Sequence, residues 1–223
     1  MFHISDEPVY ENLDRYCEVA DKIYDLLKDF TILEALEDYR VYEKGYIDIP
    51  VCKTITAHTF EGRCDNLWVY YTGEESTGGK SNRIFQVPRE RNRMLGVQMY
   101  ANNVKGFLQW AYNYYYGKQS RYLFNPAYNP SGGFHLAGTS YLVYPAINGD
   151  AYQSVRQKMY ADGINDVRLM RLLEKQTSRE TCERIMNKYF GKVTFDTSPD
   201  NPETFIDFID EVYAELEKSV DKK

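Results

Sequence analysis

The stretch Leu67-Trp68-Val69-Tyr70-Tyr71-Thr72 is the clearest strand signal in the chain, because it is a short run rich in aromatic and β-branched residues. A polar segment with several glycines follows at residues 73–83 and is typical of an exposed loop. Residues 89–103 place apolar side chains at helical spacing, and residues 106–113 again favour a strand. This strand–helix–strand order predicts that the two strands pair in parallel.

The same alternation continues on both sides of this unit. Further strands are predicted at residues 2–5, 31–33, 46–52 and 141–144, and further helices at 11–28, 154–175, 179–190 and 203–218. Strands that alternate with helices predict an α/β fold built on a parallel sheet.

The number of strands narrows this fold class. A closed (β/α)8 barrel needs eight strands, whereas this sequence offers only about four or five strands with interleaved helices and begins inside a strand. We therefore expect the C-terminal part of a TIM (β/α)8-type barrel at residues 1–176 and a C-terminal helical extension at residues 177–223. An upstream half-barrel segment is the partner that this expectation implies.

Composition excludes several classes of partner. The net charge is −6 with a pI near 5.2, and no stripe of Lys and Arg is present, which argues against nucleic-acid binding. No apolar run approaches the roughly 20 residues of a membrane span, and no secretory signal is readable, so localisation stays open.

The four cysteines are scattered, which favours free or buried thiols, and no residues have metal-ligand spacing. The 21 tyrosines suit sugar binding, but they equally suit core packing.

The pair Asp6-Glu7 is the first candidate for chemistry. It follows a predicted strand at residues 2–5 and precedes Pro8. In parallel barrels, catalytic groups project from the carboxyl ends of strands. Two carboxyl groups that lie close together have pKa values that are pushed apart, so one group stays ionised while the other keeps a proton and can act as an acid. The alternative is structural, because an Asp in front of a helix is a good N-cap.

Several ordered motifs carry a resemblance to a known family. The segment Phe2-His3-Ile4-Ser5-Asp6-Glu7-Pro8 is similar to the active-site strand of glycoside hydrolase family 123, the β-N-acetylgalactosaminidase family. Further similar segments follow in the same order at residues 67–71, 81–85, 91–96, 106–113, 141–145, 154–156 and 162–166. Together they extend over most of residues 2–175, whereas the last 45 or so residues carry no family signal.

The resemblance implies a retaining, substrate-assisted hydrolysis of β-linked N-acetylgalactosamine, in which the acetamido oxygen of the sugar attacks its own anomeric carbon. Carried over to this sequence, Glu7 is the general acid/base and Asp6 orients the acetamido N–H. It also implies a carbohydrate substrate and no cofactor or metal, and it leaves export or a periplasmic location of full-length relatives open. The alternative is a truncated, non-catalytic remnant or sugar-binding module of the same family.

Substrate contacts are predicted from aromatic and polar side chains near strand ends. Trp110 offers an indole face for a pyranose ring, and Asn113 can bind a hydroxyl or acetamido group. Tyr70 and Tyr112 are weaker candidates of the same kind, and Arg83 follows the polar loop. The alternatives are packing for Trp110 and a structural salt bridge for Arg83.

Overall fold

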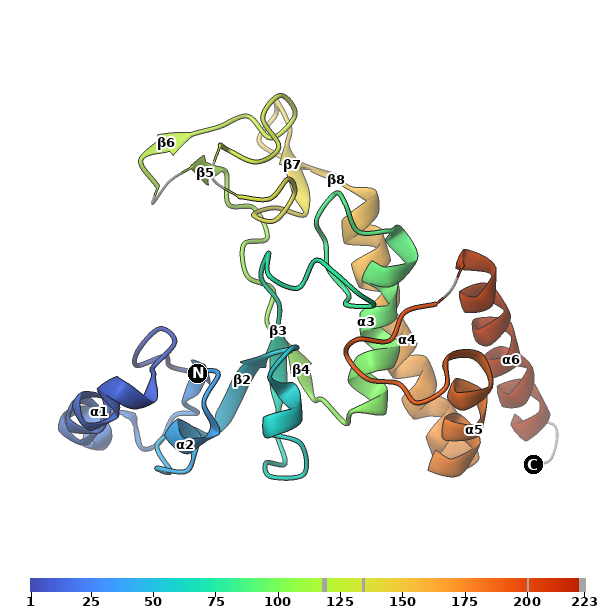
Figure 1. Cartoon of the computed structure of the whole chain (residues 1–223), viewed down its shortest axis with the longest axis horizontal. Helices are drawn as coiled ribbons and strands as arrows, with labels where there is room; N and C mark the ends of the chain where they lie inside the picture. Colours follow the sequence, from blue (N-terminus) through green and yellow to red (C-terminus); the bar gives the residue numbers. More distant parts are fainter. Residues whose placement is uncertain (118–119, 134, 200, 221–223) are drawn as a thin grey trace. The chain divides into compact units, whose positions relative to one another are not determined.

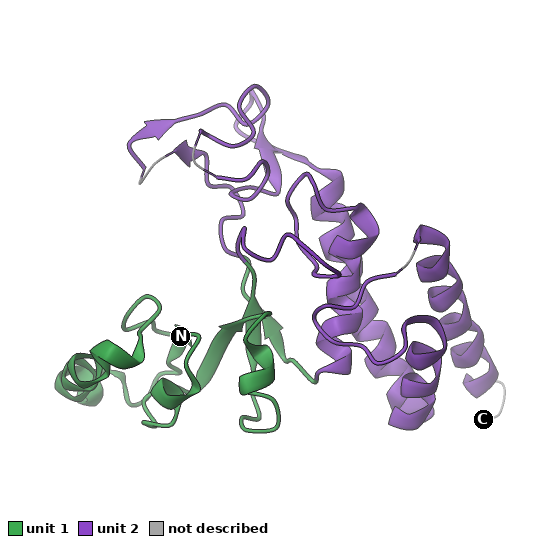
Figure 2. Cartoon of the chain, in the orientation of Figure 1, with its two compact units in different colours: residues 1–71, 103–109 green, residues 72–102, 110–223 purple. Residues whose placement is uncertain are grey.

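The computed structural model describes residues 1–117, 120–133, 135–199 and 201–220 (Figure 1). The chain forms two compact units, coloured separately in Figure 2. Unit 1 comprises residues 1–71 and 103–109, and unit 2 comprises residues 72–102 and 110–223. The sequence predicted a boundary after residue 176, between a partial barrel and a helical extension. The two compact units do not test that boundary, so it stays a prediction.

Unit 1 is a parallel sheet with helices. Its strands are β1 (Leu33–Ala35), β2 (Ile49–Lys53), β3 (Trp68–Tyr70) and β4 (Gly106–Phe107). They lie in the order β1-β2-β3-β4, and every neighbouring pair is parallel. Phe2 adds a parallel bridge to Ile32. The parallel sheet predicted from the alternation of strands and helices is therefore confirmed.

The core of unit 1 lies along its central strand. Every residue of β2 is buried, as expected for a strand that is covered on both faces. Helix α1 (Leu13–Leu27) buries Leu13, Tyr16 and Ala20, which share one helical face. The remaining helical segments of this unit are η1 (Tyr10–Asn12), α2 (Tyr39–Tyr42) and η2 (Ala57–Thr59).

Unit 2 is built on four helices, α3 (Arg89–Ala101), α4 (Val155–Gln176), α5 (Arg179–Phe190) and α6 (Pro202–Val220). One apolar core joins them, with Met94, Met170, Ile185 and Phe208 among its most buried members. Helices α3 and α4 approach closely at two glycines: a Cβ on Gly96 would lie 1.9 Å from the carbonyl oxygen of Gly163. The absence of side chains at this crossing is what permits the contact.

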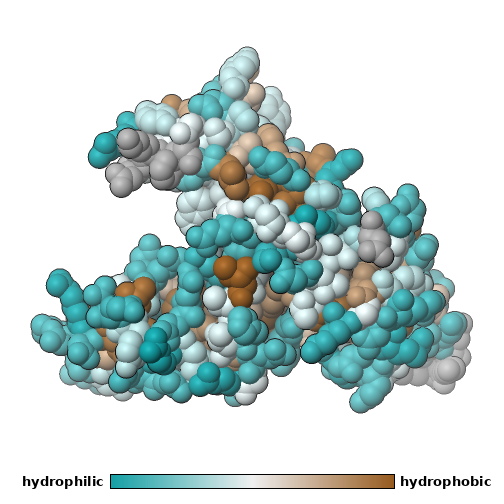
Figure 3. Space-filling view, viewed as in Figure 1, coloured by the Kyte–Doolittle hydropathy of each residue, from teal (hydrophilic) through white to brown (hydrophobic). Residues whose placement is uncertain are grey.

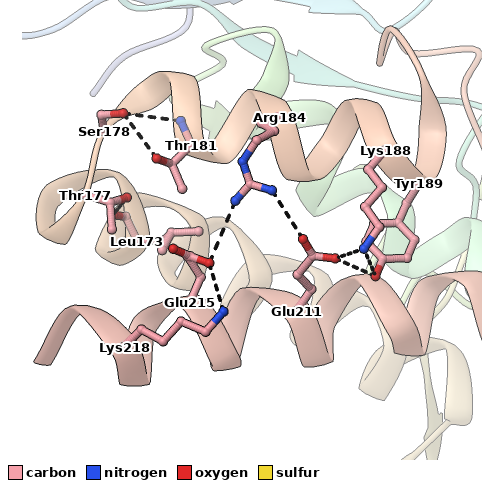
Figure 4. A network of polar contacts seen from close by, with 10 residues as sticks. All are labelled: Leu173, Thr177, Ser178, Thr181, Arg184, Lys188, Tyr189, Glu211, Glu215 and Lys218. Atoms are coloured by element: carbon pink, nitrogen blue, oxygen red, sulfur yellow. Dashed lines mark hydrogen bonds and ion pairs between the residues drawn. The ribbon is translucent and has the colours of Figure 1, made fainter. Parts of the chain in front are cut away.

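Helices α5 and α6 are joined on their outer side by ion pairs (Figure 4). Arg184 lies 3.5 Å from Glu211 and 3.8 Å from Glu215, and Glu211 also accepts hydrogen bonds from Lys188 and Tyr189. Ser178 caps α5 by accepting the N–H of Thr181. The surface over these helices is mainly hydrophilic on the face seen in Figure 3.

Three predicted strands differ from the structure. The segment 2–5 forms only an isolated bridge at Phe2 and no regular strand. The segment 106–113 is a strand only at Gly106–Phe107, because the chain turns away and Ala111 adopts a positive φ of 56°. The segment 141–144 does not join the parallel sheet. There, β7 (Val143–Pro145) pairs antiparallel with β8 (Ala151–Gln153) through a short turn at Asn148-Gly149.

A second short hairpin in unit 2 pairs β5 (Tyr116–Gly117) with β6 (Tyr122–Leu123), again antiparallel. All four cysteines are free thiols, as predicted, and Cys52 and Cys182 are buried. No helix among the described residues combines the length and the apolar character needed to cross a membrane.

Candidate functional site

The polar residues of unit 1 gather where its parallel strands end. Asp6 and Glu7 follow the segment bridged to Ile32, Glu37 follows β1, Lys53 ends β2 and Tyr70 ends β3. Carboxyl ends of parallel strands share one edge of a sheet, so these five side chains belong to the same edge. We call this set of residues the carboxylate edge.

Glu7 is held in an unusual conformation. Its backbone has a φ of 44°, in the left-handed region that non-glycine residues rarely adopt. Its side-chain carboxylate accepts a hydrogen bond from the hydroxyl of Tyr70, whose side chain is almost fully buried at 3% exposure. Two of the predicted site residues are thus in direct contact.

Asp6 differs sharply from its neighbour. Its side chain is 91% exposed, and its carboxylate lies 4.0 Å from Nε2 of His3. No N-cap bond from Asp6 is formed, because η1 begins at Tyr10 with Val9 as its N-cap residue. The alternative role of Asp6 as a helix cap is therefore wrong for this fold.

A cleft of about 420 Å³ opens beside the carboxylate pair. Its walls include Ser5, Asp6, Glu7, Asn12 and Arg15. A second hollow of about 270 Å³ shares Glu7 and reaches Glu37. The Glu7 carboxylate thus borders space large enough to receive a small ligand.

Lys53 and Glu37 form an ion pair within the carboxylate edge that the sequence did not reveal. Lys53 Nζ lies 2.5 Å from Glu37 Oε1, and the lysine is only 8% exposed. A lysine at the end of an otherwise apolar strand was the available signal, since Lys is rarely buried without a partner.

Glu34 is a second buried charged residue of this region that the sequence did not mark as a candidate. It lies within β1 and is fully buried. Its Oε1 accepts the backbone N–H of Ile4 at 2.6 Å and that of Ser5 at 3.2 Å, while the Tyr16 hydroxyl lies at 3.4 Å. A Glu in a short apolar strand gave no sign of these partners, which are 18 to 30 residues away in sequence.

The remaining predicted residues belong to unit 2. Arg83 is fully buried, and its guanidinium donates from Nε to the carbonyl of Thr139 at 2.9 Å and from Nη2 to that of Trp110 at 3.2 Å. The guanidinium carbon lies 5.7 Å from the centre of the Trp110 ring, which itself is 38% exposed. Arg83 and Trp110 are therefore brought together, with the arginine inside and the indole accessible.

His135 completes this group, which we call the arginine cluster (Arg83, Trp110, His135 and Thr139). Its ring packs edge-on against Trp110, with ring centres 5.6 Å apart. Burial lowers the pKa of His135, and the nearby positive charge of Arg83 lowers it further. Both causes favour the neutral imidazole.

Tyr112 and Asn113 follow Trp110 in an extended segment. The carbonyl of Tyr112 accepts the N–H of Leu142 at 2.8 Å, and Asn113 forms an antiparallel bridge with Tyr141. Tyr112 is 42% exposed, and the side chain of Asn113 is also on the surface. This backbone pairing fixes the segment while leaving both side chains accessible.

Within the described ranges, no group of three or more His, Cys, Asp and Glu side chains is arranged to hold a metal ion. The groups that the site offers are instead carboxylates, a buried lysine and tyrosine hydroxyls. Carboxylates beside a cleft can move protons and can stabilise a developing positive charge.

The fold and the site define an α/β protein with acid–base groups at the carboxyl edge of a parallel sheet. The chain belongs to glycoside hydrolase family 123, because residues 1–173 match the model of the glycoside hydrolase 123 catalytic domain. The family membership expected from the sequence motifs is thereby confirmed.

One similar solved structure is a family 123 glycoside hydrolase from Clostridium perfringens, studied for glycolipid glycan hydrolysis. The two chains are 18% identical with a TM-score of 0.59, which indicates a shared fold. The match covers 97% of this chain and 40% of the other, so this chain spans less than half of that protein's length. No curated protein matches the chain.

Proposed function

We propose that this chain contributes to the hydrolysis of terminal β-linked N-acetylgalactosamine, or a closely related 2-acetamido sugar, by a retaining, substrate-assisted mechanism. The observation that carries the proposal is the Asp6-Glu7 pair at the carboxylate edge of a family 123 catalytic domain. Glu7 borders the cleft and is oriented by Tyr70.

In the first step, the acetamido oxygen of the sugar attacks its own C1, and the bond between C1 and the leaving oxygen breaks. Glu7 gives its proton to that oxygen, and Asp6 accepts a hydrogen bond from the acetamido N–H as the ring of the oxazolinium intermediate closes. In the second step, Glu7 takes a proton from water while the water oxygen attacks C1, and the bond between C1 and the acetamido oxygen breaks, which restores the acetamido group. The product keeps the β configuration because C1 is inverted twice.

The sheet of unit 1 supports a barrel as the parent fold. Its strands are parallel and neighbour each other in sequence order, as they do in a (β/α) barrel. A doubly wound sheet instead reverses its strand order part-way. We therefore propose that β1 to β4 are consecutive strands of a TIM-type barrel that further strands complete.

The sugar contacts of Trp110, Tyr112 and Asn113 remain part of the proposal. Their accessible side chains support it, since a ring face or amide must be open to meet a sugar. Tyr70 and Arg83 take indirect roles: Tyr70 orients Glu7, and Arg83 fixes the backbone of Trp110.

The test measures aryl alcohol release from an aryl N-acetyl-β-galactosaminide, using the longest natural polypeptide that contains these residues. Replacing Glu7 by Gln removes the transferable proton and should lower kcat about 10² to 10⁴-fold. Added azide, which needs no base to attack C1, should restore turnover and give a β-glycosyl azide. Glu61→Gln, at an exposed glutamate of unit 1, is the matched control.

Equal rates for the wild type and Glu7→Gln would refute catalysis by this pair. Saturable sugar binding without turnover, weakened by Trp110→Ala, would identify a sugar-binding module instead. Replacing the galacto substrate by its gluco epimer in the same assay defines the preferred sugar.

A further inference from the structure

Glu34 is a buried carboxylate that touches the segment leading into the Asp6-Glu7 pair. Its side chain has no exposed surface, and Oε1 receives the N–H groups of Ile4 and Ser5. Both amides lie within three residues of Glu7. Glu34 therefore joins β1 to the backbone that presents the catalytic pair.

Burying the Glu34 carboxylate does not obviously raise the free energy of unfolding. Burial is the largest influence on Glu34 and raises its pKa, so the charged form is disfavoured despite the hydrogen bonds that it accepts. Buried charges are retained in some proteins because they define one conformation rather than because they stabilise the fold. A precise local conformation is what the neighbouring catalytic pair requires.

The backbone conformation of Glu7 explains why the preceding segment must be held in place. Its φ of 44° is strained for a non-glycine residue, and such strain persists only where the surroundings enforce it. The contacts on either side do so: Glu34 holds the amide of Ser5 before the turn, and Tyr70 holds the carboxylate of Glu7 itself.

We propose that Glu34 is a positioning residue that holds the backbone before Glu7, so that the strained turn presents the Glu7 carboxylate in its catalytic orientation. This inference rests on the proposed function. Glu34 itself acts through Ile4 and Ser5 and does not contact the sugar.

His3 contacts the second carboxylate oxygen of Glu34. His3 Nδ1 lies 2.5 Å from Glu34 Oε2 and 3.2 Å from the carbonyl oxygen of Leu33, so this nitrogen faces two oxygen acceptors. Its other nitrogen is 4.0 Å from the exposed Asp6 carboxylate, a distance at which an exposed pair contributes little. The contact of His3 with Glu34 is therefore both shorter and more buried than its contact with Asp6.

The decisive variant is Glu34→Gln. A carboxylate has two acceptor oxygens, whereas an amide has one, so Gln cannot serve both the Ile4 and Ser5 amides and the His3 ring. We expect kcat to fall on the order of tenfold to a hundredfold with KM changed by less than about threefold. We also expect the thermal midpoint to stay the same or rise, because a neutral side chain avoids the penalty of burying a charge.

Asp48→Asn is the matched control. Asp48 Oδ2 accepts the N–H of Ile32 at 2.7 Å, which is the same bond between a carboxylate and a neighbouring strand, placed before β1 and β2 rather than after them. This variant should leave kcat within about twofold of the wild type, because it lies at the amino edge of the sheet.

Amide hydrogen exchange at Ile4 and Ser5 supplies a readout that needs no turnover. Glu34→Gln should accelerate exchange at these two amides, and Asp48→Asn should not. A kcat equal to that of the wild type, or a loss of kcat that merely follows a lowered thermal midpoint, would overturn the proposal. If the wild type itself shows no turnover, the proposed function fails, while unchanged exchange in Glu34→Gln would independently refute the role of Glu34.

Discussion

The carboxylate edge of unit 1 and the arginine cluster of unit 2 use charged and aromatic residues in opposite ways. At the carboxylate edge the catalytic candidate Glu7 is accessible and its aromatic partner is buried: Glu7 borders a cleft, while Tyr70 donates a hydrogen bond to it from inside. In the arginine cluster the charged residue is buried and the aromatic one is accessible: Arg83 holds backbone carbonyls beneath the exposed Trp110. Both types of residue were candidates for substrate contact in the sequence, and only burial separates their roles.

This contrast indicates which changes should affect activity and which should affect folding. A strained, accessible carboxylate is available for chemistry at the expense of stability. A buried guanidinium bonded to carbonyls stabilises its surroundings and has no open face for a ligand. Substitutions in the two regions should therefore separate activity from stability.

Arg83→Met should give the largest effect on stability. It removes donors from the carbonyls of Thr139 and Trp110, and each buried acceptor left unpaired costs about 1–3 kcal/mol, so we expect a loss of about 3 kcal/mol. Urea denaturation followed by Trp110 fluorescence in a Trp68→Phe background measures it in unit 2. Arg168→Met, at an exposed arginine of α4, is the control and should change stability by less than about 0.5 kcal/mol. Undiminished stability with a raised KM would instead make Arg83 a substrate contact.

A smaller effect should reveal the strain at Glu7. Glu7→Ala and Glu7→Gly both remove the bond from Tyr70, but only glycine accepts a φ of 44° without strain. We expect the Gly variant to be more stable than the Ala variant by about 1 kcal/mol. At Glu18, on the exposed side of α1, the same pair should reverse, with Ala more stable by about 1 kcal/mol. Urea unfolding of the four variants gives the difference in unfolding free energy between the Gly and the Ala variant at each position. If Ala is the more stable residue at position 7 as well as at position 18, Glu7 is not strained.

Much of the fold could be predicted because its signals are local. The helix expected at residues 179–190 coincides with α5, since Ser178 caps it and Gly191 ends it. The segment 106–113 was predicted too long because nothing in its sequence signals the positive φ of Ala111. The antiparallel hairpin at β7 and β8 did have a signal, the Asn148-Gly149 pair, which favours tight hairpin turns.

The candidate site could be predicted only in part. Asp6 and Glu7 were recognised because family motifs surround them, and membership in that family is confirmed. Glu34 and the pairing of Lys53 with Glu37 were missed because they depend on contacts between separate strands. The roles of Tyr70 and Arg83 likewise depend on burial, which no short motif encodes.

The smallest expected effects are two pH dependences of opposite sign. Burial raises the pKa of Glu34, although the amide of Ile4 and His3 oppose the shift. The folded state then binds this proton more tightly than the unfolded state does, so the contribution to stability is full below the ordinary value of 4.5 and is lost as the pH rises through the folded pKa. For His135 the pKa is lowered, first by burial and then by Arg83. Its contribution is full above the ordinary value of 6.5 and is lost as the pH falls through the folded pKa.

One tryptophan lies in each unit, Trp68 in unit 1 and Trp110 in unit 2, so single-tryptophan variants can report the two effects separately. In the Trp110→Phe background, the urea midpoint of unit 1, measured from about pH 3 to about pH 8, should decline as the pH rises. Adding Glu34→Gln should remove this decline. His135→Gln should remove a decline with falling pH in the Trp68→Phe background. Burial disfavours the charged form of both groups, so it should change stability in opposite pH directions for an acid and for a base. Slopes of the same sign in both units would therefore mean that burial does not cause one of the two effects. Opposite slopes would confine each effect to its own unit and tie it to the burial of a single side chain.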